Sequence, residues 1–269
     1  NRWKRIEDAK SLKNQPFKVV YLQDDIMGAA YATKFTKPFA DVMSKEVGKP
    51  IHGHVRFDTT AKDEKIAKEL SRAGVTGVHV AIEAGDEHIR NEVHKRQMSY
   101  EQITKGAEYL HRNGIKMMTQ NILGAPGETR EQMLKTLELN ILVKPTFASA
   151  SIFQPYPGTS ELEYARDKGH MPTMDQDRLI DVFGFDTFYS GSILAMDSKE
   201  KRWMEVFQKF FAIVVDDPRM YTEGKLESMM QPYIDNPNRD EELNIMYRQH
   251  RAQKDEELYG VKFKDVVAA

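Results

Sequence analysis

The sequence predicts an α/β fold, a partial (β/α) TIM-like barrel followed by a helical C-terminal extension. Short β-rich runs alternate with amphipathic helical segments over the first two thirds of the chain, which is typical of βαβ units around a parallel sheet. The chain contains neither GxGxxG nor GxxxxGK(S/T), so a barrel fits better than a doubly wound nucleotide-binding sheet. After about residue 167 the pattern becomes helical and is interrupted by proline-containing breakers.

The expected strands are short apolar runs bounded by polar or turn-forming residues. The first run, FKVVYLQ, is followed directly by two aspartates, and the third, GVHVAI, is rich in β-branched residues. These expected strands are residues 17–23, 54–57, 77–82, 115–123 and 146–153.

The intervening helices are predicted from helical apolar spacing and from capping residues. Thr60 is expected to cap a helix over residues 61–73, and Ser99 is expected to cap a longer helix that ends at Gly114. Further helices are expected at residues 33–47, 88–95 and 128–142.

The chain is expected to divide into a barrel core over residues 1–169 and a helical extension over residues 170–269. Within the extension, residues 199–215 and 241–257 have helical patterns. The apolar face of the first of these segments is expected to pack onto the barrel.

Composition excludes several classes of function. The chain has 269 residues, with 39 Lys and Arg against 41 Asp and Glu, so no positive surplus favours general nucleic-acid binding. Its apolar runs are too short to span a membrane and no apolar signal core follows the N-terminus, so we expect a cytoplasmic location. Cysteine is absent, which excludes disulfides, thiolate nucleophiles and iron–sulfur clusters held by this chain's own residues.

The chemistry is expected at the carboxyl ends of the strands, where parallel α/β sheets and barrels place their sites. These strand exits carry both signs of charge, which suits a ligand with a carboxylate, an amine and hydroxyl groups. The anionic residues are Asp24, Asp25, Glu83 and Glu128, and the cationic residues are Arg56 and Arg96.

Four segments in order resemble the motifs of the radical S-adenosylmethionine (radical SAM) enzymes. GVHVAIEAGD followed by HKR resembles their fourth-strand motif, NILGAPGET the fifth, and FQPYPGTSEL the sixth. LQDD resembles the second-strand signature of the subgroup that carries a cobalamin-binding domain. The resemblance covers roughly residues 17–169.

The resemblance implies an enzyme that uses a 4Fe–4S cluster to cleave S-adenosylmethionine to a 5′-deoxyadenosyl radical and so modify an organic substrate. The subgroup adds cobalamin as a cofactor and methylation, or a ring-forming rearrangement, as the outcome. A reductant protein such as flavodoxin or ferredoxin is the implied partner.

The resemblance also implies roles for individual residues. Asp24 and Asp25 would meet the methionine amine, Glu83 the ribose, and Arg96 the methionine carboxylate, while Arg56 occupies the third-strand position. The exits of the fifth and sixth motifs would cradle adenine, and the turn before Glu128 would present free N–H groups. The adenine-binding residues would be Ile122, Leu123, Gly124, Phe153 and Gln154.

One departure from the family pattern is the missing cluster loop. The family holds its cluster with a CxxxCxxC loop, and this chain has no cysteine. We therefore expect that an N-terminal portion with the first strand and that loop is missing, and that this chain alone is inactive. The alternative is a cluster-free, degenerate barrel that acts as a binding scaffold.

Two further interpretations concern the histidines of the expected strands and the candidates for substrate contact. His52 and His54 form a His-x-His pattern, which is also typical of metal-dependent barrel hydrolases, although hydrogen-bonded interior histidines are the stronger expectation. Alternation places His54 where it can approach His79 on the next strand. Phe185 is expected in a substrate lid, and Tyr156 is a second candidate for substrate contact.

Overall fold

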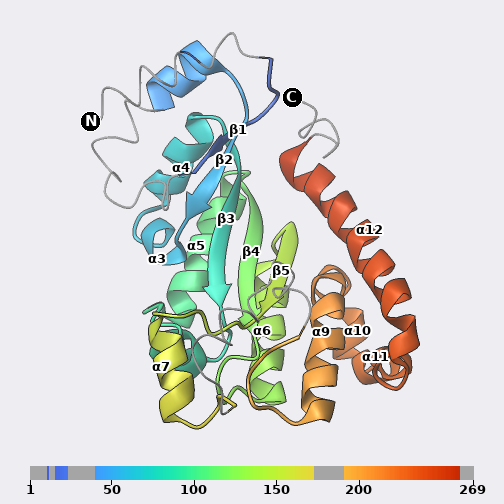
Figure 1. Cartoon of the computed structure of the whole chain (residues 1–269). Helices are drawn as coiled ribbons and strands as arrows, with labels where there is room; N and C mark the ends of the chain where they lie inside the picture. The colour runs from blue at the N-terminus through green and yellow to red at the C-terminus, as the bar shows by residue number, and fades with distance from the viewer. Residues whose placement is uncertain (1–10, 12–15, 24–39, 173–190, 261–269) are drawn as a thin grey trace.

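The computed structural model describes residues 11, 16–23, 40–172 and 191–260, and its centre is a five-stranded parallel sheet (Figure 1). The strands are adjacent in sequence order, and all their carboxyl ends lie at one edge. This confirms the predicted partial barrel with a helical C-terminal region. The strands are β1 (Val20–Leu22), β2 (Ile51–Val55), β3 (Val75–Glu83), β4 (Lys116–Leu123) and β5 (Phe147–Ile152).

Helices connect the strands and continue after the last one. The connections hold π-helix η2 (Met43–Val47), α3 (Phe57–Thr60), α4 (Glu64–Arg72), π-helix η3 (Ile89–Val93), α5 (Tyr100–Arg112) and α6 (Arg130–Val143). After β5 come α7 (Ser160–Asp167), α9 (Ser198–Asp216), α10 (Arg219–Thr222), α11 (Leu226–Ile234), η4 (Pro237–Arg239) and α12 (Asp240–Tyr259).

Capping explains where two of these helices begin. Ser99 caps α5 in a capping box with Gln102, as the sequence predicts. The expectation that Thr60 caps the preceding helix is wrong, because the chain first forms α3 and the Thr60 hydroxyl donates to the Phe57 carbonyl. Asp63 caps α4 instead, accepting a hydrogen bond from the Lys65 N–H at 2.9 Å.

The helices after β5 share a hydrophobic core with the sheet. Helix α9 packs on β5 and α6, which confirms the expected packing of this segment onto the barrel (Figure 1). Trp203 and Phe207 stack within this core with ring centroids 4.7 Å apart. Along the described part of the chain, no helix has both the length and the apolar character needed to cross a membrane.

Two histidines meet on the face of the sheet that α12 contacts. The β2–β3 register pairs His54 with His79, and their ring centroids lie 5.3 Å apart, which confirms the predicted approach. The Tyr21 hydroxyl lies 2.8 Å from His54 Nε2 and 3.0 Å from His79 Nδ1. Tyr259 of α12 hydrogen-bonds His79 Nε2 at 2.9 Å, so this polar group helps to fix the last helix on the sheet.

Candidate functional site at the strand exits

Glu83 ends β3 in an unusual backbone conformation. Its φ is 64°, in the left-handed region, and the register with β4 shifts between Ala81 and Glu83. The side chain is 15% exposed. Burial raises the pKa of Glu83 above its usual range, and the opposite charge of Arg96 partly offsets this effect.

Arg96 faces Glu83 from the loop after η3. Its Nε lies 3.5 Å from Glu83 Oε1, which is an ion pair rather than a well-formed hydrogen bond. The neighbouring residues Lys95 and Gln97 both have a φ of 52°. The Arg96 N–H donates to the Arg90 carbonyl at 3.0 Å, so a tightly turned backbone aims this guanidinium at the strand exit.

Arg56, at the exit of β2, supports this loop. Its guanidinium donates to the Asp58 carboxylate at 2.9 and 3.2 Å and to the Arg96 carbonyl at 2.9 Å. The structure therefore brings together Arg56, Glu83 and Arg96, as predicted from the strand exits. Arg56 contacts the backbone of Arg96, and its charge lowers the pKa of Glu83.

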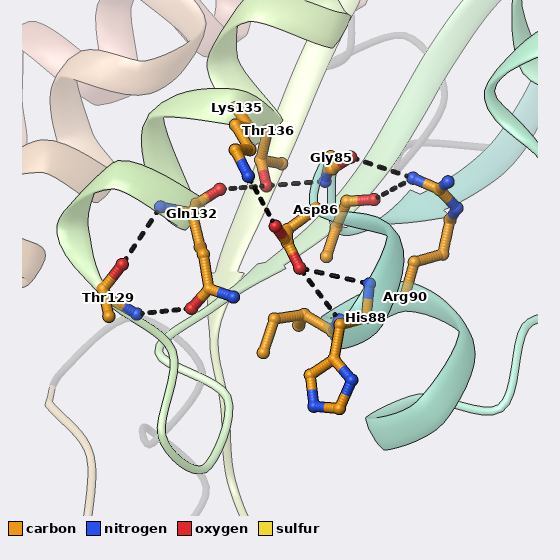
Figure 2. Close-up of polar contacts among 10 residues, drawn as sticks. Gly85, Asp86, His88, Arg90, Thr129, Gln132, Lys135 and Thr136 are labelled. Atoms are coloured by element: carbon orange, nitrogen blue, oxygen red, sulfur yellow. Dashed lines mark hydrogen bonds and ion pairs between the residues drawn. The ribbon is translucent and has the colours of Figure 1, made fainter.

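A polar network fixes the turn after Glu83 against α6 (Figure 2). Asp86 pairs with Lys135 Nζ at 2.8 Å and accepts hydrogen bonds from the N–H groups of His88 and Ile89. The Gly85 N–H donates to the Thr136 hydroxyl at 2.8 Å. These contacts tie the start of the η3 segment to a second helix and so limit movement of Glu83.

The same turn depends on a glycine and on a buried arginine. A Cβ on Gly85 would lie 2.2 Å from the Lys135 carbonyl oxygen, so only glycine lets the turn approach α6 this closely. Arg90 is 1% exposed and donates to the carbonyls of Ala84, Gly85 and Met98. The buried Arg90 side chain thus provides hydrogen-bond donors for the backbone carbonyls of the turn.

The turn after β4 differs from the expectation that it presents free N–H groups. Glu128 Oε2 accepts hydrogen bonds from the N–H groups of Gly124 at 2.7 Å and of Ala125 at 3.0 Å. The turn therefore satisfies its own donors. Helix α6 begins later than expected, at Arg130, because Thr129 and Gln132 form its capping box. Burial raises the pKa of Glu128 to about 8, against the lowering effect of the two N–H donors.

A pocket of about 160 Å³ opens beside the exits of β4 and β5. Apolar side chains and a few polar groups form its walls, a composition typical of small-molecule sites. Its lining includes the predicted residues Ile122, Phe153, Gln154 and Tyr156. It also includes five residues that the sequence patterns did not indicate, namely His94, Ser151, Ile152, Thr159 and Glu161.

The other predicted site residues lie elsewhere. Leu123 is fully buried in the core shared with α9, and a Cβ on Gly124 would lie 2.2 Å from Met204 Sδ of the same helix. Gly124 therefore permits close packing of α9. Asp24, Asp25 and Phe185 lie outside the described residues.

Comparisons with known proteins identify the family that part of the chain resembles. The sequence model of the radical SAM superfamily matches residues 30–139. Over these residues the chain is similar to radical SAM enzymes. The matched residues include Arg56, Glu83 and Arg96, the charged group at the strand exits.

Two curated proteins are similar to the chain in sequence. An uncharacterized methyltransferase of Pyrococcus horikoshii is 28% identical over 113 residues, which is 42% of this chain and 24% of that protein. An anaerobic magnesium-protoporphyrin IX monomethyl ester cyclase of Rubrivivax gelatinosus is 21% identical over 230 residues, which is 78% of this chain and 39% of that protein. The chain thus spans about a quarter and about two fifths of the length of these relatives.

Two solved structures share the fold of this chain. The radical SAM methyltransferase TsrM of Kitasatospora setae, with tryptophan substrate and a SAM analogue bound, aligns with a TM-score of 0.53 at 18% identity, covering 65% of this chain and 34% of that one. Coproporphyrinogen III oxidase (HemN) of Escherichia coli aligns with a TM-score of 0.51 at 13% identity, covering 79% of this chain and 45% of that one.

The residues present fit S-adenosylmethionine and do not fit an iron–sulfur cluster. The pocket, the adjacent Glu83–Arg96 pair and a buried His94 Nε2 without a hydrogen-bond partner among the described residues offer apolar, charged and polar contacts. In contrast, the chain has no thiolate for a cluster.

The His-x-His pattern behaves as a structural feature. His52 Nε2 hydrogen-bonds the Thr76 hydroxyl at 3.2 Å, and its ring lies 4.7 Å from the Tyr259 ring. Within residues 16–23, 40–172 and 191–260, no three His, Cys, Asp or Glu side chains are placed to hold one metal ion.

Proposed function

We propose that this chain is the S-adenosylmethionine-binding part of a radical SAM enzyme that modifies an organic substrate. The observation that carries the proposal is the placement of Glu83 and Arg96, 3.5 Å apart, at the strand exits of the region that is similar to radical SAM enzymes. A guanidinium binds a carboxylate through a planar pair of N–H donors, and a carboxylate accepts hydrogen bonds from ribose hydroxyls.

The proposed contacts divide between the two parts of the ligand. Arg96 binds the methionine carboxylate and Glu83 the ribose, while Ile122 and Phe153 offer apolar walls to the adenine ring. Arg56 is a positioning residue, because it holds the Arg96 carbonyl. Contacts of Asp24 and Asp25 with the methionine amine stay a prediction. Together with a reduced iron–sulfur cluster, S-adenosylmethionine supplies a carbon-centred radical.

The cluster ligands are proposed to come from outside these 269 residues, since the chain has no cysteine. By itself the chain would then be inactive in radical chemistry. Sequencing the gene upstream of the codon for Asn1 tests this point. A CxxxCxxC loop there supports the proposal, whereas a long upstream sequence without cysteine favours the cluster-free scaffold.

The outcome of the reaction is proposed from the relatives. One relative is named a methyltransferase and the other a cyclase, which supports methylation or ring formation on an organic substrate. Use of cobalamin, a reductant such as flavodoxin or ferredoxin, and a cytoplasmic location complete the proposal. Comparing cobalamin content and methylated products in the full-length enzyme separates the two outcomes.

Calorimetric titration of the chain with S-adenosylmethionine tests the binding role. We expect Arg96→Gln to weaken binding by about one to two orders of magnitude, because a charge-assisted pair contributes roughly 1.5–3 kcal/mol. Lys95→Gln is the matched control, since Lys95 is the exposed neighbour of Arg96 and its side chain forms a surface ion pair with Glu92 at 3.8 Å. A wild-type chain that does not bind S-adenosylmethionine would contradict the proposal and favour the scaffold.

A further inference from the structure

His94 is a buried imidazole in the wall of the pocket. It is 8% exposed, and its Nε2 has no hydrogen-bond partner among the described residues. An unpaired buried polar atom destabilises the fold, so its presence in a pocket wall needs a physical reason. A ligand that completes the hydrogen bond would supply one.

The surroundings of His94 fix its position and its charge state. The backbone N–H of His94 donates to the Ile89 carbonyl at 3.0 Å and so closes the last turn of η3. Its ring centroid lies 6.0 Å from that of Phe153, another pocket residue. Burial lowers the pKa of His94 to about 4, with Glu161 acting in the opposite direction and Arg96 in the same direction. At neutral pH the uncharged ring has one N–H donor and one acceptor nitrogen.

The geometry points to His94 as a ligand-binding residue whose Nε2 forms a hydrogen bond with the adenosyl part of S-adenosylmethionine. This inference rests on the function proposed above. His94 shares the pocket with Ile122 and Phe153, whereas the charged end of the ligand is assigned to Arg96. A neutral imidazole suits the uncharged base or ribose better than the methionine end, which carries both a carboxylate and an amine.

Two ligands and two variants separate these roles. The ligands are S-adenosylmethionine and 5′-methylthioadenosine, which keeps the adenosyl part and lacks the amino-acid end. We expect His94→Leu to weaken binding of both ligands about tenfold, the cost of one unpaired polar group on the ligand. Arg96→Gln should weaken only S-adenosylmethionine. His94→Gln, which keeps a polar atom near the same place, should recover part of the loss.

His88→Leu is the matched control, because His88 is an exposed histidine next to the same π-helix and its ring makes no drawn contact (Figure 2). Thermal unfolding provides a second readout. Removal of an unpaired buried imidazole should keep or raise the melting temperature, whereas loss of a merely structural contact would lower it.

Three results would overturn the inference. They are equal affinity of wild type and His94→Leu for both ligands, a loss confined to S-adenosylmethionine, and a lowered melting temperature together with unchanged affinity. If wild type binds neither ligand, the proposed function itself fails, and that outcome is distinct from the other three.

Discussion

Glu83 and Arg96 face each other across 3.5 Å, and the backbone at or beside both residues adopts left-handed conformations. In the described part of the chain, four residues other than glycine have positive φ, and three of them, Glu83, Lys95 and Gln97, belong to this pair and its flanks. Strain concentrated at one place is typical of sites where side-chain direction matters more than stability.

Relieving this backbone strain should stabilise the fold and weaken ligand binding. Lys95→Gly and Gln97→Gly should each raise the free energy of unfolding by about 1 kcal/mol, since glycine adopts positive φ without a steric penalty. They should also weaken S-adenosylmethionine binding about threefold, because Arg96 must then be ordered on binding. Chemical denaturation and calorimetry measure the two effects. Lys144→Gly is the control, because Lys144 has a φ of 52° at the end of α6, and stabilisation there should leave binding unchanged.

Glu128 should be protonated in the folded chain at neutral pH. Burial raises the pKa of Glu128 to about 8, whereas the pKa of an unfolded glutamate is about 4.3. Between these values the folded state holds a proton that the unfolded state has lost, so the free energy of unfolding contributed by Glu128 falls as pH rises. The slope should be about 1.4 kcal/mol per pH unit.

Variants of Glu128 check this reasoning. Glu128→Gln keeps an oxygen acceptor for the N–H groups of Gly124 and Ala125 and should remove the pH dependence. Glu128→Ala leaves both donors buried and unpaired and should cost about 2–4 kcal/mol. Urea denaturation between pH 5 and pH 8 measures both. If Glu128→Gln is as unstable as Glu128→Ala, this result would contradict a protonated Glu128 in the folded chain.

The buried histidines should destabilise the fold in acid. Burial lowers the pKa of His52, His79 and His94 to about 4, against about 6.5 for an unfolded histidine. As pH falls from about 6.5 to 4 the unfolded state binds protons that the folded state excludes, so the free energy of unfolding decreases. His94→Leu removes one of these protons and should therefore reduce the slope of the free energy of unfolding against pH by about 1.4 kcal/mol per pH unit. Denaturation experiments at a series of pH values measure this slope.

Gly85→Ala should strongly destabilise the chain. The added Cβ would lie 2.2 Å from the Lys135 carbonyl oxygen, so the turn after Glu83 must move away from α6, at a cost of about 3 kcal/mol. Gly114→Ala is the matched control, since Gly114 has a φ of 68° and open space, and the cost there should be only about 1 kcal/mol. Equal melting temperatures for the two variants would show that the turn tolerates the shift.

Much of the fold follows from local sequence patterns. The apolar run of β3 and the point where it ends place Glu83 correctly at the exit of the strand. The capping pattern at Ser99 correctly predicts the start of α5. The wrong cap at Thr60 arose because α3 is too short to give a periodic apolar signal. Strand β2 also begins earlier than expected, at Ile51, because the histidines in IHGHV obscure its apolar pattern.

The site was predictable only in part. The charged residues lie at strand exits, where topology alone brings them together. His94 could not be selected, because its burial depends on Phe153 and on residues before and within α7 that lie more than fifty positions later in the chain. The role of Glu128 was missed for a related reason, since its side chain folds back to cap its own turn instead of leaving N–H groups for a ligand.

A crystal structure of the chain with 5′-methylthioadenosine bound would show whether this pocket binds the adenosyl part of S-adenosylmethionine. We expect ligand density in the pocket between Ile122 and Phe153, with His94 Nε2 within hydrogen-bond distance and the ribose near Glu83. Density at another place, such as the face of the sheet that carries His54 and His79, would contradict this expectation.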